Sequence, residues 1–461
     1  MRARAILASG ALAASLAGCA HWPENAPLAK ADPRAGYRLE NVKRPGQSDD
    51  LLLFLAFSGG GTRAASLSYG VLEELARTEV ALGGARRRLL DEVDVISAVS
   101  GGSFTATYYA LRGDRTFEEF QNRFLKRNVE RAIAGRVLSP RSWFRLPSGT
   151  FNRSDVAAEL YDDTVFDHAT YADLLKSGGP YVVVNGADVT TGARFPFTQE
   201  TFDALCSDLS KFPIARAVAT SSALPPQLYP ITLRNRAGTC GWQPPAWAAE
   251  GAPGAPLGRG GLRARELRSY ANAAERPYVH LFDGGIAENL GLRTLIEALD
   301  TVAAALPSIA PGITGGPREI VAIVVNAHKD PSRDWDRSPE PPGKSDLVDQ
   351  MGSIPVDRYS FEAIEAARDQ LARWEKAAPG RRAHLVEVSF EGIADPTERR
   401  WFYDLPTSFK LEAEQVDRLR EVAGRLLRES PEFQQVLADL GGAATAPKPV
   451  SEQPAPAPAG R

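Results

Sequence analysis

Short, continuous apolar runs recur along the chain and alternate with stretches of helical periodicity. Leu51–Phe57 and Val93–Val99 contain few polar residues, which is typical of strands buried on both faces of a parallel sheet. Helical patterns follow them, over Ala64–Arg77 and Phe104–Leu111. Further strands are expected at Tyr181–Val184, Tyr278–Phe282, Ile320–Val325 and His384–Val388. The alternation predicts an α/β fold, a three-layer α/β/α sandwich with a mainly parallel central sheet.

Two stretches interrupt this alternation. Gln243–Arg265 is rich in Pro, Gly and Ala and predicts a long loop, part of an insertion near residues 243–277. Residues 441–461 carry five prolines among Ala, Lys and Ser and predict a disordered tail. Before the tail, Leu411–Leu440 has one apolar face, which indicates a C-terminal helix divided at Pro431. Residues 51–440 are therefore expected to form one elaborated domain.

The composition limits the kinds of partner and of catalytic residue that the chain can use. The 461 residues include 54 Lys and Arg against 57 Asp and Glu, so no basic excess indicates a nucleic-acid partner. With three cysteines and five histidines, a disulfide-rich scaffold or a Cys/His metal cluster is not expected. The chemistry must then depend mainly on Ser, Asp, Glu, Arg or backbone groups, with no metal and no cofactor.

The first residues form a targeting segment. Arg2 and Arg4 precede a short apolar run that ends in Leu16-Ala17-Gly18-Cys19. This ending resembles the lipobox of bacterial lipoproteins, which implies that residues 1–18 are a signal peptide and that Cys19 becomes lipidated. Residues 19–50 would then be a tether. Because no Asp follows Cys19, the outer membrane is favoured, on its periplasmic face or at the cell surface. The alternative is an ordinary signal peptide with a chance cysteine.

The other two cysteines are Cys206 and Cys240. An exported protein occupies a compartment that permits disulfides, so the two could pair. Two separate buried thiols are the alternative, because spacing alone does not show that the side chains meet.

Three motifs follow apolar strands. Ser58-Gly59-Gly60-Gly61-Thr62-Arg63 can turn tightly and present N–H groups to an anion at a helix N-terminus, and it lacks the spacing of a nucleotide-phosphate loop. Ala98-Val99-Ser100-Gly101-Gly102 is a strand–turn–helix pattern that would expose a nucleophilic Ser100, with Ala98 where the elbow motif has its first glycine. Asp283-Gly284-Gly285 places a carboxylate at a strand end, where it could act as a general base.

Each motif alone has a simpler interpretation, as a structural turn, a helix-capping serine or an Asp-Gly turn. Their shared position at strand ends, where α/β folds gather their sites, favours a nucleophile, a base and an oxyanion site, the set needed for acyl transfer.

In this order the motifs resemble those of the patatin-like phospholipase family, over roughly Leu51 to Val325. Ala187–Gly192, Ala217–Pro225 and Asn289 are weaker matches. The resemblance implies a patatin-like α/β/α fold and a dyad in which Ser100 attacks an ester and Asp283 takes its proton. The N–H groups of the Gly59–Gly61 loop, chiefly those of Gly60 and Gly61, would hold the oxyanion, helped by Arg63. Ala98 and the insertion depart from the family pattern.

His280 is the alternative base, but strand alternation places it on the opposite face from Asp283, and a buried structural role is expected for it. The implied substrate is a lipid acyl ester, a phospholipid or lysophospholipid, so the membrane lipid would be both substrate and anchor; protein partners are unknown. Arg141–Arg145 contains aromatics and arginines that suit a bilayer interface, or it is an ordinary surface turn. A catalytically silent, lipid-anchored binding or assembly protein is the competing hypothesis.

Overall fold

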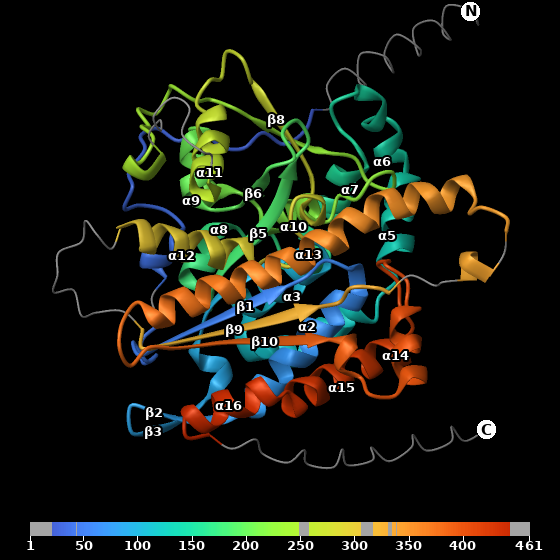
Figure 1. Cartoon of the computed structure of the whole chain (residues 1–461). Coiled ribbons are helices and arrows are strands. Elements are labelled where there is room, and N and C mark those ends of the chain that lie inside the picture. The colour runs from blue at the N-terminus through green and yellow to red at the C-terminus, as the bar shows by residue number, and fades with distance from the viewer. Residues whose placement is uncertain are drawn as a thin grey trace, which may run out of the picture.

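The computed structural model describes residues 21–42, 44–248, 258–305, 317–330, 334–337 and 339–442. Its central sheet has the strand order β10-β9-β1-β4-β5-β8-β7, and β6 pairs with β5 (Figure 1). The pairs from β10 to β5 are all parallel, whereas β8 is antiparallel to both of its neighbours. The strands are β1 Leu51–Phe57, β4 Val93–Val99, β5 Tyr181–Asp188, β6 Arg194–Pro196, β7 Ile231–Arg234, β8 Tyr278–Asp283, β9 Glu319–Asn326 and β10 Arg382–Ser389, with the separate hairpin β2 Glu79–Leu82 and β3 Ala85–Arg88.

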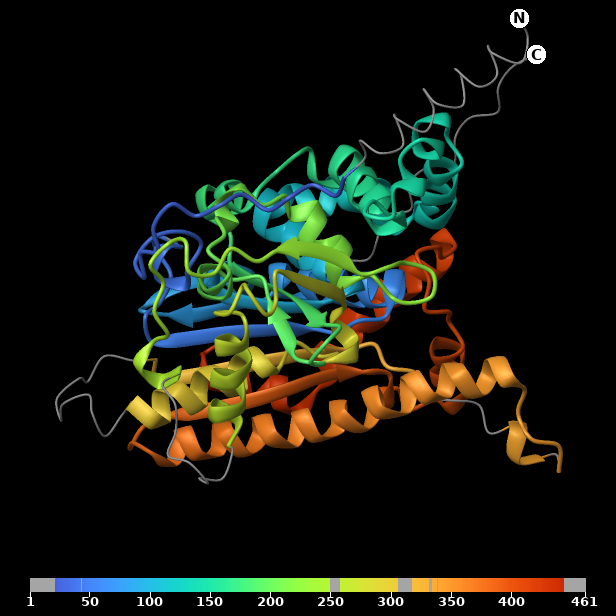
Figure 2. The same cartoon turned by 90° about the horizontal axis from the view of Figure 1, so that it is seen from above.

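Helices cover both faces of the sheet, so the predicted α/β/α sandwich is confirmed. Figure 2 shows α12 and α13 on one face, and α3 with the other blue-green helices on the opposite face. The helices are α2 Gly61–Arg77, α3 Gly101–Arg112, α4 Thr116–Phe120, α5 Val129–Val137, α6 Pro140–Trp143, α7 Arg153–Tyr161, α8 Tyr171–Lys176, α9 Gln199–Ala204, α10 Ile214–Ser221, α11 Arg259–Ser269, α12 Arg293–Ala305, α13 Lys344–Lys376, α14 Pro396–Tyr403, α15 Ala413–Glu429 and α16 Pro431–Asp439. None of the helices among the described residues is long and apolar enough to cross a membrane.

The strands predicted from apolar runs all form. The central ones do so because their residues are buried on both faces of the sheet, whereas one face of β8 is open to solvent. β1, β4 and β9 are each buried almost throughout. The C-terminal helix also forms as expected, and Val416, Leu419, Val422, Leu426 and Leu427 of α15 are all buried. It ends before Pro431, which is the first residue of α16.

Part of the predicted insertion loop is helical instead. α11 begins at Arg259, within the stretch expected to be a loop. The Arg-rich sequence after Gly261 consists mostly of good helix formers, and Ala264 and Leu267 place an apolar face against the core. Residues 249–257 of the insertion, the signal peptide, Cys19 and most of the 441–461 tail lie outside the described residues.

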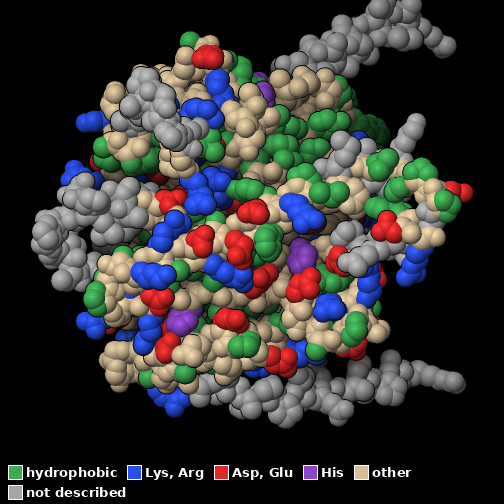
Figure 3. All heavy atoms as spheres, in the orientation of Figure 1, with side chains coloured by type: hydrophobic (Ala, Val, Ile, Leu, Met, Phe, Trp, Pro, Cys, Tyr) green, Lys and Arg blue, Asp and Glu red, His purple; other side chains and the backbone are tan. Residues whose placement is uncertain are grey.

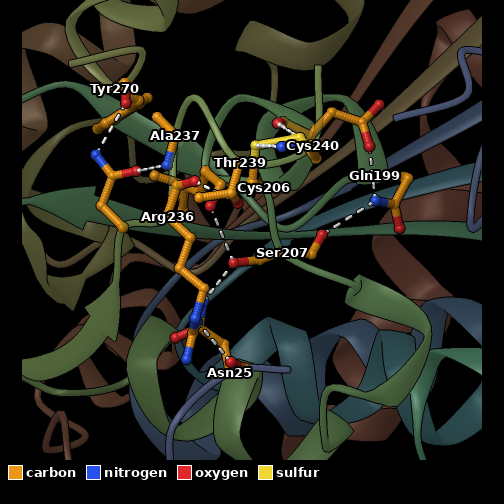
Figure 4. The surroundings of a disulfide bond; sticks show 12 residues. Asn25, Gln199, Cys206, Ser207, Arg236, Ala237, Thr239, Cys240 and Tyr270 are labelled. Carbon is orange, nitrogen blue, oxygen red and sulfur yellow. Dashed lines mark hydrogen bonds between the residues drawn. A yellow bond between two sulfur atoms is a disulfide. The ribbon is translucent and has the colours of Figure 1, made fainter. Parts of the chain in front are cut away.

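The stretch from residue 21 to residue 50, expected as a tether, lies against the domain instead. Trp22 and Tyr37 are 7% and 1% exposed, and this burial favours packing over a free linker. The Tyr37 hydroxyl accepts a hydrogen bond from the Val182 N–H, 2.8 Å away at the start of β5. Near the disulfide, the Asn25 amide donates to Ser207 Oγ at 2.5 Å (Figure 4).

Cys206 and Cys240 form a disulfide in the structure, with their Cα atoms 5.4 Å apart (Figure 4). The bond joins residues 34 positions apart, and closing a loop of that size stabilises a domain by about 3–4 kcal/mol. We expect the double substitution Cys206→Ser and Cys240→Ser to lower the melting temperature while leaving the far-ultraviolet circular dichroism spectrum at 25 °C unchanged. An unchanged melting temperature would contradict this structural role. Adding reductant to the double variant, which should have no further effect, is the control.

Candidate active site

Ser100 lies between the end of β4 and the start of α3, in a strained backbone conformation. Its φ is 47° and its ψ is −120°, which costs a non-glycine residue about 1–3 kcal/mol. Two glycines make the turn possible: a Cβ on Gly101 would lie 2.0 Å from the Gly61 carbonyl oxygen, and one on Gly102 would lie 2.7 Å from that of Ser58. Ala98 lies within β4 itself, so an alanine at that position requires no unusual backbone.

The side chains of Ser100 and Asp283 meet. Ser100 Oγ donates a hydrogen bond to Asp283 Oδ2 at 2.9 Å, and the Gly285 N–H donates to Asp283 Oδ1 at 2.8 Å. Ser100 is 7% exposed and Asp283 is 5% exposed. Burial raises the pKa of Asp283 to about 6, although the hydrogen bonds from Gly285 and Ser100 oppose the shift. The pair is thus a buried hydroxyl beside a carboxylate that ionises below neutral pH.

The route by which Asp283 reaches Ser100 differs from the one expected. β8 is antiparallel to β5. The shared strand direction that would bring the C-terminal ends of parallel strands together therefore does not explain why the end of β8 lies beside Ser100. However, β5 extends past β4: Asn185 pairs with Val99 at the end of β4, and Gly186, one residue further, pairs with Asp283. Asp283 therefore arrives beside Ser100 from the opposite direction.

A second set of residues positions this pair. Ser221 Oγ, at the end of α10, accepts from the Ser100 N–H at 2.8 Å and donates to the Asn185 carbonyl at 2.6 Å. The Asp283 N–H donates to the Ala223 carbonyl at 3.1 Å. Gly284 allows the close approach, because a Cβ there would lie 2.1 Å from the Asn185 carbonyl oxygen. Sequence reasoning assigned no role to Ser221 or Asn185, although Ser221 lies in the small-residue segment Ala217–Pro225.

The glycine loop lies against the same serine. A Cβ on Gly59 would lie 3.3 Å from Ser100 Cβ and 2.4 Å from Asn289 Oδ1, so a larger residue would displace the Asn289 side chain and press on Ser100. The Gly59 N–H donates to the Asn289 carbonyl at 2.9 Å. Within the described part of the chain, the N–H groups of Gly60 and Gly61 have no acceptor. α2 begins at Gly61 and α3 at Gly101, so two positive helix ends lie close to Ser100.

Arg63 does not point to the reacting atoms, contrary to the expected oxyanion role. Its guanidinium donates to the carbonyls of Ala327 and Leu405, at 3.0 and 2.7 Å, and to Thr407 Oγ1 at 3.1 Å. These bonds hold the residues that follow α14 against the glycine loop. The Thr62 N–H donates to the Ser408 carbonyl at 2.9 Å in the same region. Arg63 thus supports the loop from behind.

The structure also places His280, the alternative base. His280 is exposed rather than buried, because its face of β8 is open to solvent, and it lies on the opposite face from Asp283. Its ring nitrogen Nδ1 lies 3.0 Å from Thr232 Oγ1.

Asp188, in the weaker match Ala187–Gly192, accepts from Arg276 at 2.6 Å and from the Tyr270 hydroxyl at 3.0 Å. It ties α11 and the residues after it to the sheet.

Sequence reasoning expected no metal-binding cluster, and the described residues contain one group with suitable atoms. Glu319, His384 and Asp439 have ligand atoms within 4.8 Å of one another. Arg382 pairs with Glu319 at 2.7 Å and lies 3.9 Å from Asp439, so a cationic side chain already faces both carboxylates. Glu319 begins β9, whereas Ser100 follows the end of β4, so the group lies at the opposite end of the parallel strands from Ser100.

The combination of a parallel α/β sheet, a serine on a strained strand-to-helix turn and a carboxylate bonded to it defines the class of α/β proteins with a nucleophile elbow. The model of the family described as patatin-like phospholipase matches residues 55–296, slightly more than half of the chain. The chain belongs to the patatin-like phospholipase family, and thus to a family of lipid acyl hydrolases.

Two solved structures align with the chain at low identity. Human GIVD cytosolic phospholipase A2 aligns with a TM-score of 0.43 and 12% identity, covering 85% of this chain. This chain spans 62% of the length of that human protein. VipD from Legionella pneumophila aligns with a TM-score of 0.33 and 12% identity, covering 91% of this chain and 71% of VipD. No curated protein sequence matches the chain.

Proposed function

We propose that this protein is a serine hydrolase that cleaves acyl esters of membrane phospholipids or lysophospholipids. The observation that carries the proposal is the 2.9 Å hydrogen bond from Ser100 Oγ to Asp283 Oδ2 on a strained strand-to-helix turn. A hydroxyl is a weak nucleophile unless a base accepts its proton as it attacks. Asp283 is such a base, and it is the only carboxylate that contacts Ser100 among the described residues.

The reaction would proceed in two halves. Ser100 Oγ attacks the acyl carbonyl carbon and passes its proton to Asp283 Oδ2, and the carbonyl oxygen becomes an oxyanion. Collapse of this intermediate breaks the ester bond and expels the alkoxide of a lysophospholipid or of a glycerophosphodiester. This alkoxide takes the proton from Asp283, and the acyl group stays on Ser100. Water then gives a proton to Asp283 as it attacks the acyl carbon. The bond from this carbon to Ser100 Oγ breaks, Ser100 Oγ takes the proton back from Asp283, and the fatty acid is released.

The oxyanion would be stabilised by the backbone of the glycine loop. The N–H groups of Gly60 and Gly61 are the donors available there, since that of Gly59 is already bonded to Asn289. Fixed donors of this kind contribute about 3–4 kcal/mol each to the transition state. Arg63 contributes by holding the loop in place rather than by contacting the oxyanion.

The substrate class follows from the family and from the leader of the chain. Lipidation at Cys19 would hold the enzyme on a membrane, most simply the outer membrane, where its substrate is at hand. The alternative, a silent binding protein on this fold, would retain the topology without needing the strained Ser100, the bonded Asp283 and the unoccupied N–H groups together. Their coexistence supports an active enzyme.

The proposal is tested by product analysis. The full-length chain is incubated with vesicles of a defined phospholipid mixture, and the fatty acids and lysolipids that form are measured by mass spectrometry. Release of fatty acid by the native chain and not by Ser100→Ala supports the proposal. Vesicle binding without any product, under all conditions tried, would favour the silent binding protein.

The pKa of Asp283 predicts a pH dependence. The base must be ionised, so kcat/KM for a soluble ester should be constant above neutral pH and fall through an apparent pKa of about 6. At pH 5 the rate should be roughly one tenth of its plateau. A pH–rate profile measured with a short-chain ester checks this. A rate that stays constant down to pH 4.5 would exclude Asp283 as the base with this pKa.

A further inference from the structure

The segment from residue 126 to residue 153, which includes α5 and α6, is strongly basic. It contains seven Lys and Arg and one Glu, in a chain of net charge −3. Lys126, Arg136 and Arg145 pair with carboxylates of other helices or loops. The remaining four arginines are exposed and have no ion-pair partner among the residues that the structure describes: Arg127, Arg131, Arg141 and Arg153.

The same segment exposes large apolar side chains. Leu138, Trp143 and Phe144 are 70%, 62% and 51% exposed. Their backbone is nevertheless well fixed: Ser142 Oγ donates to the Arg136 carbonyl at 2.7 Å, and Arg145 makes two hydrogen bonds to Glu159. These apolar side chains are therefore exposed although the turn that carries them is fixed. Their contact with water is unfavourable.

Further exposed apolar side chains lie in a loop that is bonded both to α7 and to Asp283. α7 begins at Arg153, and Ser154 bonds to both the N–H and the carbonyl of Tyr229, in the loop that follows α10. That loop begins beside Ala223, which accepts from the Asp283 N–H. Leu224 and Tyr229, in the same loop, are 42% and 55% exposed. Figure 3 shows hydrophobic side chains gathered over the area that α6 and α7 occupy in Figure 1.

We propose that Leu138, Trp143, Phe144, Leu224 and Tyr229 form a docking surface for an anionic phospholipid bilayer. The inference rests on the proposed function and adds how the site would reach its substrate. Aromatic side chains are favourable at the level of lipid headgroups, and each arginine near an anionic leaflet adds about 1 kcal/mol, or roughly fivefold in affinity. The charge of this segment thus complements an anionic lipid surface.

The start of the chain agrees with this orientation. The dark-blue start of the described chain lies beside the α5–α6 region in both views (Figures 1 and 2). Cys19, the expected lipidation site, is two residues before the first described residue. A lipid on Cys19 would therefore hold the docking surface, and not the opposite edge of the sheet, toward the bilayer.

A site-specific probe tests the contact directly. The full-length chain carries Cys19→Ser, to remove the lipid and the free thiol, and Ser100→Ala, so that binding is measured without turnover. An environment-sensitive fluorophore is attached at Phe144→Cys or, as a control, at Leu39→Cys, which is 46% exposed in the native chain and lies in the turn before β1. The vesicles are phosphatidylcholine with or without phosphatidylglycerol.

We expect a blue shift at position 144 with phosphatidylglycerol vesicles, weakened by salt, and none at position 39. Equal shifts at both positions, or no shift at position 144 while the chain cosediments with the vesicles, would overturn the proposal. So would self-association without lipid that Trp143→Ser abolishes, because the occupant would then be a second copy. Because Ser100→Ala removes turnover, a failure of the proposed function leaves this result interpretable.

The contribution of charge is tested by two sets of substitutions that remove the same number of positive charges. Arginine-to-glutamine changes at Arg127, Arg131, Arg141 and Arg153 should weaken binding to phosphatidylglycerol vesicles by at least about tenfold. The same four-charge change at Arg34, Arg86, Arg318 and Arg373, which are exposed elsewhere, should have much less effect. Equal losses from the two sets would contradict a localised docking surface.

Discussion

Replacing Ser100 by alanine should lower kcat/KM for any ester substrate by about 10⁴-fold or more while leaving the fold intact. The loss is expected because no other hydroxyl among the described residues contacts Asp283. The fold should survive because the N–H of residue 100 can still donate to Ser221 Oγ. The measurement is the initial rate with a short-chain ester, together with a thermal melt.

Ser222→Ala is the matched control for this prediction. Ser222 is also buried, close to the site at the end of α10, and its hydroxyl donates to the Val218 carbonyl rather than to any group around Ser100. Its activity should remain within a few-fold of the native value. Retention of more than a few per cent of the native rate by Ser100→Ala would require a different nucleophile.

Asp283→Asn is expected to combine a large loss of activity with an unchanged or higher stability. An amide cannot take the Ser100 proton, so we expect kcat to fall by about 10³–10⁴-fold. The rate that remains should no longer depend on pH near 6. The measurement is the pH–rate profile of the variant, compared with that of the native chain.

The stability effect follows from the direction of the pKa shift. The pKa of Asp283 is about 6 in the folded protein, above its ordinary value near 3.8, so folding favours the protonated form. Its favourable contribution is complete below the unfolded pKa and is lost as the pH rises through about 6. At pH 8 the buried charge therefore destabilises the fold, by an amount on the order of 3 kcal/mol, and the neutral asparagine removes this penalty.

Asp188→Asn provides the contrast. Asp188 is also fully buried, but its carboxylate pairs with Arg276 at 2.6 Å. Removing that charge leaves a partly buried guanidinium without its partner, so the melting temperature should fall. A lower melting temperature for Asp283→Asn than for Asp188→Asn at pH 8 would contradict this explanation.

Much of the fold could be predicted from the sequence because the central strands β1, β4, β5 and β9 are buried on both faces. Such strands appear as unbroken apolar runs, and β1, β4 and β9 were located within a residue of their ends. The direction of β8 could not be predicted in this way. Its six residues have the same composition whichever way they run, and the direction depends on pairing with the extension of β5 beyond Val99.

The candidate site was predictable only where the local backbone determines it. The glycines around Ser100 and Asp283 are required by contacts that any side chain would block, and this requirement is visible as a motif. Arg63 was assigned to the oxyanion because it follows the glycine loop, yet its partners are backbone carbonyls far along the chain. Similarly, Trp22 and Tyr37 in a polar, proline-containing stretch gave no sign of the distant surfaces that bury them.

The central claim, that Ser100 is a nucleophile activated by Asp283, is tested most directly by covalent labelling. The native chain is treated with a fluorophosphonate, digested, and the modified peptide is identified by mass spectrometry. We expect one stoichiometric adduct on Ser100 that is absent from Ser100→Ala and forms much more slowly in Asp283→Asn. An adduct on a different residue, or equal labelling of the native chain and Asp283→Asn, would contradict it.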